Sequence, residues 1–333
     1  MKKVIVMKFR DIDLSDNALN SEHERLGIPP LERSIEKIAL ADSQSRVIRG
    51  AVWLTSSMLA LLVVYLLIQL FGNGTTAAKA LLGEALASDI FWSAVAVGLL
   101  AQIVDGALGM AYGVTSTTFL MASGVSPAMA SASVHVAEVF TTGVSGISHA
   151  KLGNVNKKLF LKLLLPGITG AVTGAYILTN IDGKAIKPYI SAYLLIMGIY
   201  IISKVFKKIK ANRQEPKHVA KLALVGGFVD AIGGGGWGPV VTSTLVGTGQ
   251  DPRTTIGSVN FAEFFLTFGS AITFTALVGF GPWMVVAGLV IGGLFAAPFA
   301  AYLCSKLQTR TLLLLVGTLI SVVSAFNLYK SLV

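Results

Sequence analysis

The chain has 333 residues, of which 53% are apolar and only 13% are charged. About a quarter of the residues in soluble domains are charged, so this composition excludes an ordinary soluble protein and predicts an all-α integral membrane protein. The formal net charge of +10 would suit a nucleic-acid-binding protein, but the basic residues gather in short segments between long apolar runs. That distribution is typical of cytoplasmic loops beside anionic lipid, and we expect no nucleic-acid partner. The single cysteine, Cys304, excludes an internal disulfide and a multi-cysteine metal site.

Residues 1–50 are polar and carry charges of both signs. We expect a soluble cytoplasmic extension, either partly disordered or folded against the membrane domain or a partner. No signal peptide is predicted, because the apolar run at the start is too short. No chemistry is assigned to this extension.

Residues 51–89 are predicted to hold an extra transmembrane helix and an outside loop. The stretch 52–71 runs for twenty residues without a charge, about the length that a helix needs to cross a bilayer. Arg46 and Arg49 precede it and place the N-terminus in the cytoplasm by the positive-inside rule. The loop at 72–89 could form a short surface helix.

Residues 90–206 form the first of two similar units. The stretch 90–123 is apolar apart from Asp105 and the glycine cluster at 106–113. Glycine costs a helix about 1 kcal/mol per residue relative to alanine, so we expect two half-length helices that meet at a break inside the membrane. Three crossings follow, at 127–150, 163–181 and 188–205. A basic cytoplasmic linker at 207–221 then joins the second unit.

Residues 222–333 repeat this pattern. With an offset of 125 positions and no gap, residues 104–145 match 229–270 at 15 of 42 positions. Asp105 falls on Asp230 and Glu138 on Glu263, and polar matches of this kind indicate an internal duplication. The second break lies at the glycine run 233–238, and crossings are predicted at 254–278, 283–304 and 312–330.

The loop charges predict that the two units are inverted. The basic loop follows the second element in the first unit, at Lys151 to Lys162, but the third element in the second unit, at Lys306 and Arg310. Opposite orientations require each glycine-broken element to be re-entrant, as in many secondary transporters. Lys184 and Lys187 fall outside in this topology, and parallel units with full crossings stay open as the alternative.

Four carboxylates lie within the apolar elements: Asp105, Glu138, Asp230 and Glu263. Ionisable groups inside a membrane indicate function by default, and we predict proton coupling. The two aspartates could instead cap the broken helices. His135, one turn before Glu138, could move a proton or only satisfy a hydrogen bond, and the matching residue in the second unit is Asn260.

The breaks predict an anion site built from backbone amides. Irregular backbone at membrane depth must be buried or line a cavity, and helix N-termini bind anions. There is no Lys or Arg between Trp92 and Ala150 or between Leu222 and Pro252, so amides and hydroxyls would hold an anion. Close helix packing is the competing explanation for the glycines. The predicted substrate-binding residues are Gly109, Gly113, Thr117, Ser133, His135, Gly234, Gly235, Gly236, Gly238, Thr242, Ser258 and Asn260.

From about residue 90 onward the chain resembles the sulfite exporter TauE/SafE family. The resemblance rests on the paired aspartates and glycine-rich breaks, the Gly-x-x-Pro turns ending at Pro127 and Pro252, and the loop His149-x-Lys-x-Gly-Asn-Val. It implies a proton-driven transporter of small sulfur-containing anions such as sulfite, sulfonates or sulfoacetate. The first 89 residues precede the usual start of the family.

We therefore expect a multi-pass secondary transporter in the cell membrane. Its partners would be the small anion, protons, the lipid bilayer and, as an option, a second copy of the chain. A cation transporter or channel that uses the four carboxylates is the main alternative. An enzyme is not expected, because the chain has no Ser-His-Asp arrangement and no HExxH motif. No cofactor and no metal are expected.

Overall fold

A computed structural model describes residues 45–108, 110–203, 206, 216–248, 250–279, 281–306 and 309–332. Within these ranges the chain is built of helices and has no strand. Residues 1–44, most of the predicted basic linker and the predicted site residue Gly109 lie outside the described residues. The predicted all-helical class is confirmed.

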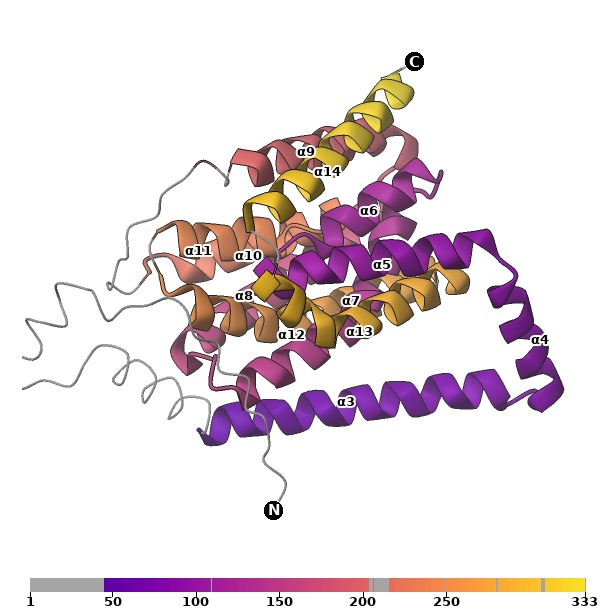
Figure 1. The fold of residues 1–333 in the computed structure, drawn as a ribbon, viewed down its shortest axis with the longest axis horizontal. Helices are drawn as coiled ribbons and strands as arrows, with labels where there is room; N and C mark the ends of the chain where they lie inside the picture. The colour runs from indigo at the N-terminus through magenta and orange to yellow at the C-terminus, as the bar shows by residue number, and fades with distance from the viewer. Residues whose placement is uncertain are drawn as a thin grey trace, which may run out of the picture.

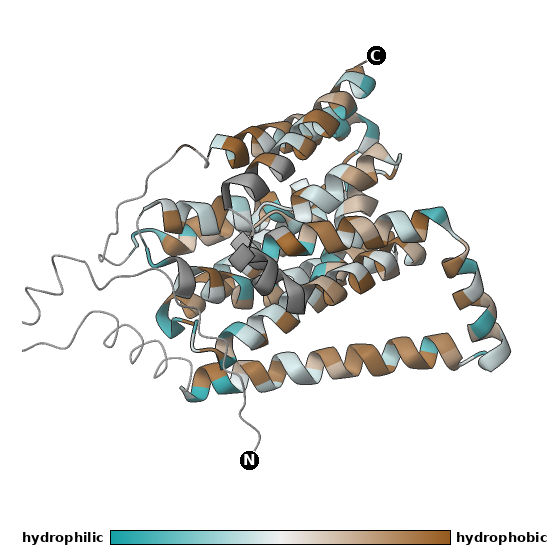
Figure 2. Ribbon diagram, in the orientation of Figure 1, coloured by the Kyte–Doolittle hydropathy of each residue, from teal (hydrophilic) through white to brown (hydrophobic). Residues whose placement is uncertain are grey.

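The first two helices of the described residues form an arm beside the bundle (Figure 1). Helix α3 spans Arg46–Phe71 and α4 spans Thr75–Leu86. The Ser45 hydroxyl caps α3 by accepting a hydrogen bond from the backbone N–H of Ile48 at 3.3 Å, so the helix starts six residues before the charge-free run. Hydrophobic residues make up most of α3 along its length (Figure 2), and only Ile48 and Thr55 are buried. Such a surface suits lipid.

Two helices are broken where the glycines predict it. Helix α5 (Asp89–Leu108) is followed by α6 (Tyr112–Ala122), and α10 (Val219–Gly233) is followed by the π-helix η2 (Gly238–Thr242) and α11 (Ser243–Gly247). We call residues 111–114 the first break and residues 234–239 the second break, so that each includes the first residues of the helix that follows it.

Each broken pair doubles back within the bundle. Ala94, near the start of α5, and Met121, near the end of α6, belong to one buried apolar cluster. Val219 at the start of α10 and Leu245 in α11 belong to another, together with Ile48. In Figure 1, α5 and α6 extend from the breaks toward one end of the bundle and α10 and α11 toward the other, and the breaks meet inside it.

The remaining helices are long and pack around the breaks: α7 (Pro127–Lys151), α8 (Lys157–Thr179), α9 (Gly183–Ser203), α12 (Pro252–Val278), α13 (Trp283–Lys306) and α14 (Thr309–Leu332). Glycines allow close contact between them. A Cβ on Gly98 of α5 would lie 2.5 Å from the Leu289 carbonyl oxygen of α13. A Cβ on Gly170 of α8 would lie 2.1 Å from the Leu224 carbonyl oxygen of α10.

Helices α8 and α9 begin earlier than the apolar pattern predicts. Helix α8 starts at Lys157 because the Asn156 side chain accepts a hydrogen bond from the N–H of Leu159 at 2.9 Å. Helix α9 starts at Gly183 and includes Lys184. Lysine side chains in the first turn of a helix can extend to the membrane surface. The helix can therefore begin before its apolar run.

Four described helices are long and apolar enough to cross a membrane: α3, α8, α9 and the segment Thr254–Val278 of α12. A fifth span results if the bent pair of α4 and α5 counts as one. Helix α7 is equally long, but it carries buried Ser, Thr, His and Glu side chains and lies among other helices. Polar side chains inside a membrane face the bundle interior, so α7 places titratable and hydrogen-bonding side chains at the centre of the bundle.

Candidate functional site

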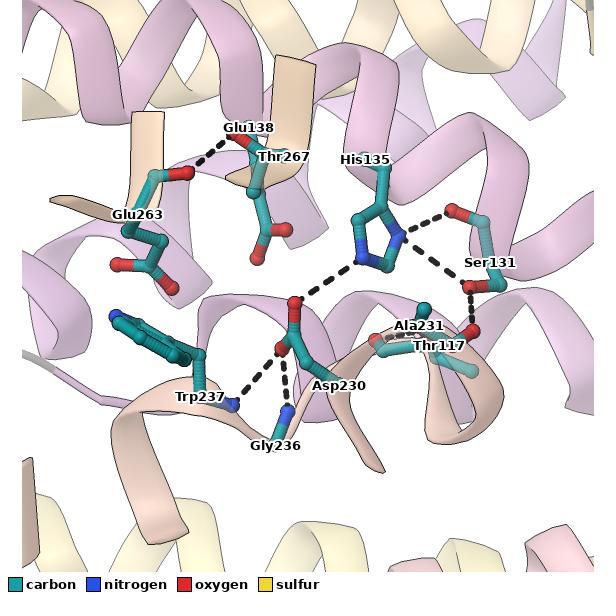
Figure 3. A network of polar contacts seen from close by, with 12 residues as sticks. Thr117, Ser131, His135, Glu138, Asp230, Ala231, Gly236, Trp237, Glu263 and Thr267 are labelled. Atoms are coloured by element: carbon teal, nitrogen blue, oxygen red, sulfur yellow. Dashed lines mark hydrogen bonds and ion pairs between the residues drawn. The ribbon is translucent and has the colours of Figure 1, made fainter. Parts of the chain in front are cut away.

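The second break is held by Asp230. The carboxylate oxygen Oδ1 accepts hydrogen bonds from the backbone N–H of Gly236 at 2.7 Å and of Trp237 at 2.9 Å (Figure 3). Gly234 and Gly235 adopt φ values of +65° and +143°, which glycine tolerates. Asp230 thus belongs to α10, while its carboxylate accepts hydrogen bonds from the first backbone amides of the half-helix that follows the break. This is the geometry of an N-cap residue.

The first break repeats this arrangement. The backbone N–H of Tyr112, which aligns with Trp237, donates a hydrogen bond to Asp105. Ala111, which aligns with Gly236, has a φ of +93° although it is not glycine. A non-glycine residue in this region is strained by about 1–3 kcal/mol and persists only where its surroundings fix it.

The two breaks cross in direct backbone contact. A Cβ on Gly235 would lie 2.2 Å from the backbone N of Val114, and one on Gly113 would lie 2.6 Å from the Cα of Gly235. The Thr117 hydroxyl also donates a hydrogen bond to the Gly234 carbonyl. Close packing therefore accounts for the glycines at 113, 234 and 235.

A small cavity lies beside this crossing. All four intramembrane carboxylates line it: Asp105, Glu138, Asp230 and Glu263. Each is at most 7% exposed, and none of the described lining residues is Lys or Arg. The cavity has room for about one water molecule. The rest of the lining comes from the breaks and consists of Ala111, Tyr112, Gly113, Val114, Gly235, Gly236, Gly238 and Pro239.

Helix α7 contributes His135 and Glu138 to this site. The Nε2 atom of His135 lies 3.1 Å from Oδ2 of Asp230, and its Nδ1 lies 2.8 Å from the Ser131 carbonyl oxygen. The Ser131 hydroxyl donates to the Ala231 carbonyl at 2.6 Å. Glu138 points toward the second break in Figure 3, and its Oε2 has no hydrogen-bond partner among the described residues. One polar atom from each of His135, Glu138 and Asp230 lies within 4.8 Å of the others.

The structure brings together only part of the predicted substrate-binding set. Gly113, Gly235, Gly236 and Gly238 line the cavity, Gly234 and Thr117 meet at the crossing, and His135 contacts Asp230. Four other predicted residues, Ser133, Thr242, Ser258 and Asn260, are buried but do not line the cavity.

Local hydrogen bonds explain three of these positions. The Ser133 hydroxyl donates to the Met129 carbonyl at 2.8 Å, one turn earlier on α7. The Ser258 hydroxyl accepts from the Asn156 N–H at 2.8 Å and so fastens the loop between α7 and α8. The Asn260 amide donates to the Ser145 hydroxyl at 3.3 Å.

Aromatic residues support the breaks and were not predicted as site residues. The Tyr112 hydroxyl donates to the Leu289 carbonyl at 3.0 Å, and the Trp237 indole donates to the Val259 carbonyl at 3.1 Å. Tyr112 and Trp237 occupy matching positions in the duplication, so the sequence does contain a signal that these aromatic residues share a role. Tyr193 of α9 donates to the Gly235 carbonyl at 2.9 Å. Tyr193 lies outside the stretch 104–145 over which the duplication is matched, so the duplication gives no hint of its role.

Comparison with known proteins tests the resemblance stated above. The family model described as Sulfite exporter TauE/SafE matches residues 94–327, which include both breaks and all four carboxylates. The chain belongs to the TauE/SafE family. The match begins at residue 94, after the arm of α3 and α4.

Two curated relatives of this TauE/SafE protein are described as transporters. "Probable membrane transporter protein YtnM" of Bacillus subtilis (strain 168) is 44% identical over 242 residues, which are 70% of this chain and 80% of the relative. "Probable membrane transporter protein ORF9" of Sinorhizobium sp is 26% identical over 210 residues, 61% of this chain and 76% of the relative. No solved structure matches. The protein is therefore a membrane transporter by family, and its several apolar helices agree with a multi-pass membrane protein.

Proposed function

We propose that the protein is a secondary transporter that moves a small sulfur-containing oxyanion, of the sulfite, sulfonate or sulfoacetate type, together with protons. Its family is described as sulfite exporters. One structural observation carries the proton coupling: four buried carboxylates line one cavity with no Lys or Arg among its described lining residues.

Electrostatics links the anion to the protons. Two like charges about 5 Å apart repel by roughly 3 kcal/mol at an effective dielectric constant of about 20. One ionised carboxylate would thus weaken anion binding by roughly 100-fold. An oxyanion can approach Asp230 or Glu138 only when these groups hold protons. Anion and proton would then move in the same direction.

Because the aspartates cap the breaks, the availability of the backbone amides for the anion also depends on whether the aspartates are protonated. The sequence predicts free N–H groups at the breaks, but the amides of Gly236 and Trp237 donate to Asp230. A protonated carboxyl group accepts hydrogen bonds less strongly than a carboxylate. Protonation of Asp230 would therefore release these amides, which could then donate hydrogen bonds to the anion. Proton binding at Asp230 and anion binding at the amides would be coupled in this way.

The helix directions favour the inverted arrangement of the two units. In α7 and its counterpart α12, Gly143 lies near Phe264 and Gly146 near Phe261, so the two helices run antiparallel. In α9 and α14, Gly198 lies near Ser321 and Gly317 near Ile202, again antiparallel. We propose inverted repeats with re-entrant broken helices and a cytoplasmic N-terminus, an architecture suited to alternating access.

Transport of a cation is the second candidate. The unpartnered Oε2 of buried Glu138 favours it, since a cation could satisfy that oxygen as well as a proton could. Thermal unfolding of the purified protein separates the two functions. Sulfite or sulfoacetate should raise the melting temperature if the proposal holds, whereas stabilisation by sodium or a divalent cation alone would favour cation transport.

Replacing Glu138 or Glu263 with glutamine should uncouple the transporter. The amide keeps the size of the side chain but cannot release a proton. In proteoliposomes we expect each variant to exchange anion for anion, yet to lose accumulation driven by a proton gradient. Glu84→Gln, at an exposed position on α4, is the matched control and should accumulate anion like the wild type. Full proton-driven accumulation by both site variants would contradict the role of the glutamates.

A further inference from the structure

We infer that His135 and Asp230 share one proton, and that this pair, joining the two units, carries a coupling proton of the transport cycle. This inference rests on the proposed function. It assigns His135 to the proton machinery, a role that the sequence left open beside substrate binding and a purely structural hydrogen bond.

The hydrogen-bond partners of His135 fix where its first proton lies. The Nδ1 atom is 2.8 Å from the Ser131 carbonyl oxygen, which can only accept a hydrogen bond. The nearby Ser131 hydroxyl donates its own hydrogen to the Ala231 carbonyl at 2.6 Å. Nδ1 must therefore carry a hydrogen, and a neutral ring would leave Nε2 as an acceptor.

The partners of Asp230 require a second proton at the contact. Its Oδ1 accepts from two backbone amides, and its Oδ2 faces Nε2 of His135 at 3.1 Å. Without a proton between them, the lone pair of Nε2 would face a carboxylate oxygen. Both side chains are at most 1% exposed, so water cannot relieve that contact. One proton must sit either on Nε2 or on Oδ2, and the contact breaks when that proton leaves.

The neighbours of the pair give this proton a route to the cavity. Glu138 lies one turn along α7, and one of its carboxylate oxygens is within 4.8 Å of ligand atoms of His135 and Asp230. Its Oε2 has no hydrogen-bond partner among the described residues. Asp105 of α5, Tyr112 of α6 and Glu263 of α12 line the same cavity, and Tyr193 of α9 faces the second break. Phe274 of α12 covers the His135 ring, with ring centres 5.6 Å apart. Asp230 and Glu138 both line the cavity and have carboxylate oxygens within 4.8 Å of each other, so Glu138 can take the proton from the pair.

The duplication shows that this pair has no equivalent at the other break. The counterpart of His135 is Asn260, whose amide cannot take up or release a proton near neutral pH. Asn260 donates to Ser145 instead, and its carbonyl oxygen has no partner among the described residues. The two half-sites are chemically unequal, and only the half that contains Asp230 holds a histidine proton.

Replacing His135 with glutamine tests the assignment in a transport assay. The glutamine amide nitrogen can reach the position of Nε2 and donate to Asp230, but it cannot release a proton. With a trapped pH-sensitive dye and labelled sulfite in proteoliposomes, we expect anion exchange to persist while the number of protons per anion falls by one. His149→Gln, at the basic end of the same helix, is the matched control and should keep the wild-type ratio. An unchanged ratio in the His135 variant would overturn the assignment.

A spectroscopic measurement on the wild-type protein covers the case in which the variant fails to fold. With ¹⁵N-labelled histidine, the signal of His135, identified by its loss in the glutamine variant or by sequential assignment, should show a protonated Nδ1 at every pH at which the protein is folded. A neutral ring with its only proton on Nε2 would refute the shared proton. If the wild type moves sulfite without protons, the proposed function fails, and the nitrogen signals still decide the state of the pair.

Discussion

Replacing Gly235 with alanine is expected to abolish transport while the protein still inserts into the membrane. The added Cβ would lie 2.2 Å from the backbone N of Val114 and 2.3 Å from the backbone C of Gly113. Backbone atoms cannot rotate away as a side chain can, so the two breaks would have to separate. The φ of +143° adds strain of about 1–3 kcal/mol for alanine, and overpacking adds about 1–3 kcal/mol more.

A matched glycine separates the backbone strain from the contact. Gly279 also has a positive φ, +82°, but a Cβ there would meet no atom within 4 Å. Gly279→Ala should lower the melting temperature slightly and leave sulfite flux in proteoliposomes near the wild-type rate. Gly235→Ala should show no flux above empty liposomes. Equal flux from the two alanine variants would mean that the crossing of the breaks is not needed for transport.

Replacing Asp230 with alanine should be the most destabilising change at the site, whereas asparagine should preserve the fold. Alanine leaves the amides of Gly236 and Trp237 buried without an acceptor, at a cost of about 1–3 kcal/mol each. Asparagine keeps one oxygen for both amides, and its NH₂ group can donate to a neutral His135. We therefore expect a well-folded but uncoupled Asp230→Asn variant.

The comparison uses thermal unfolding in detergent and proton-driven uptake in liposomes. Asp182 offers a matched cap outside the site, since its exposed carboxylate accepts a hydrogen bond from the Lys184 N–H at 3.0 Å. Asp182→Ala should cost at most about 1 kcal/mol, because water replaces the lost acceptor. If Asp230→Ala melts at the temperature of Asp182→Ala, the aspartate does not hold the second break. If Asp230→Asn still accumulates anion against its gradient, Asp230 carries no coupling proton.

The breaks and their carboxylates were predictable because their signals are local or repeated. A run of glycines disfavours a helix wherever it lies, and the offset of 125 residues marks Asp105 and Asp230 as equivalent. Helix ends were less predictable, since the caps of Ser45 and Asn156 extend α3 and α8 beyond their apolar runs.

The partners of the polar side chains could not be read from the sequence. The hydroxyl of a serine in a membrane helix can either bind a ligand or donate a hydrogen bond to the carbonyl one turn earlier. The Ser133 hydroxyl donates to that carbonyl. His135 and Asp230 are 95 residues apart, and only the packing of α7 against α10 brings them together. The sequence instead places His135 beside Glu138, its neighbour on the same helix.

The contact between His135 and Asp230 also bears on how such a protein could have arisen. The second broken helix is completed by side chains from the first unit: Asp230 by His135 of α7, and Gly234 by Thr117 of α6. A single unit on its own would leave these groups unmatched. With the two units inverted, as proposed above, an ancestral chain of half this length would have matched these groups by pairing with a second copy inserted in the opposite orientation. Fusion of the two genes would then have freed position 135 and its counterpart to diverge into histidine and asparagine.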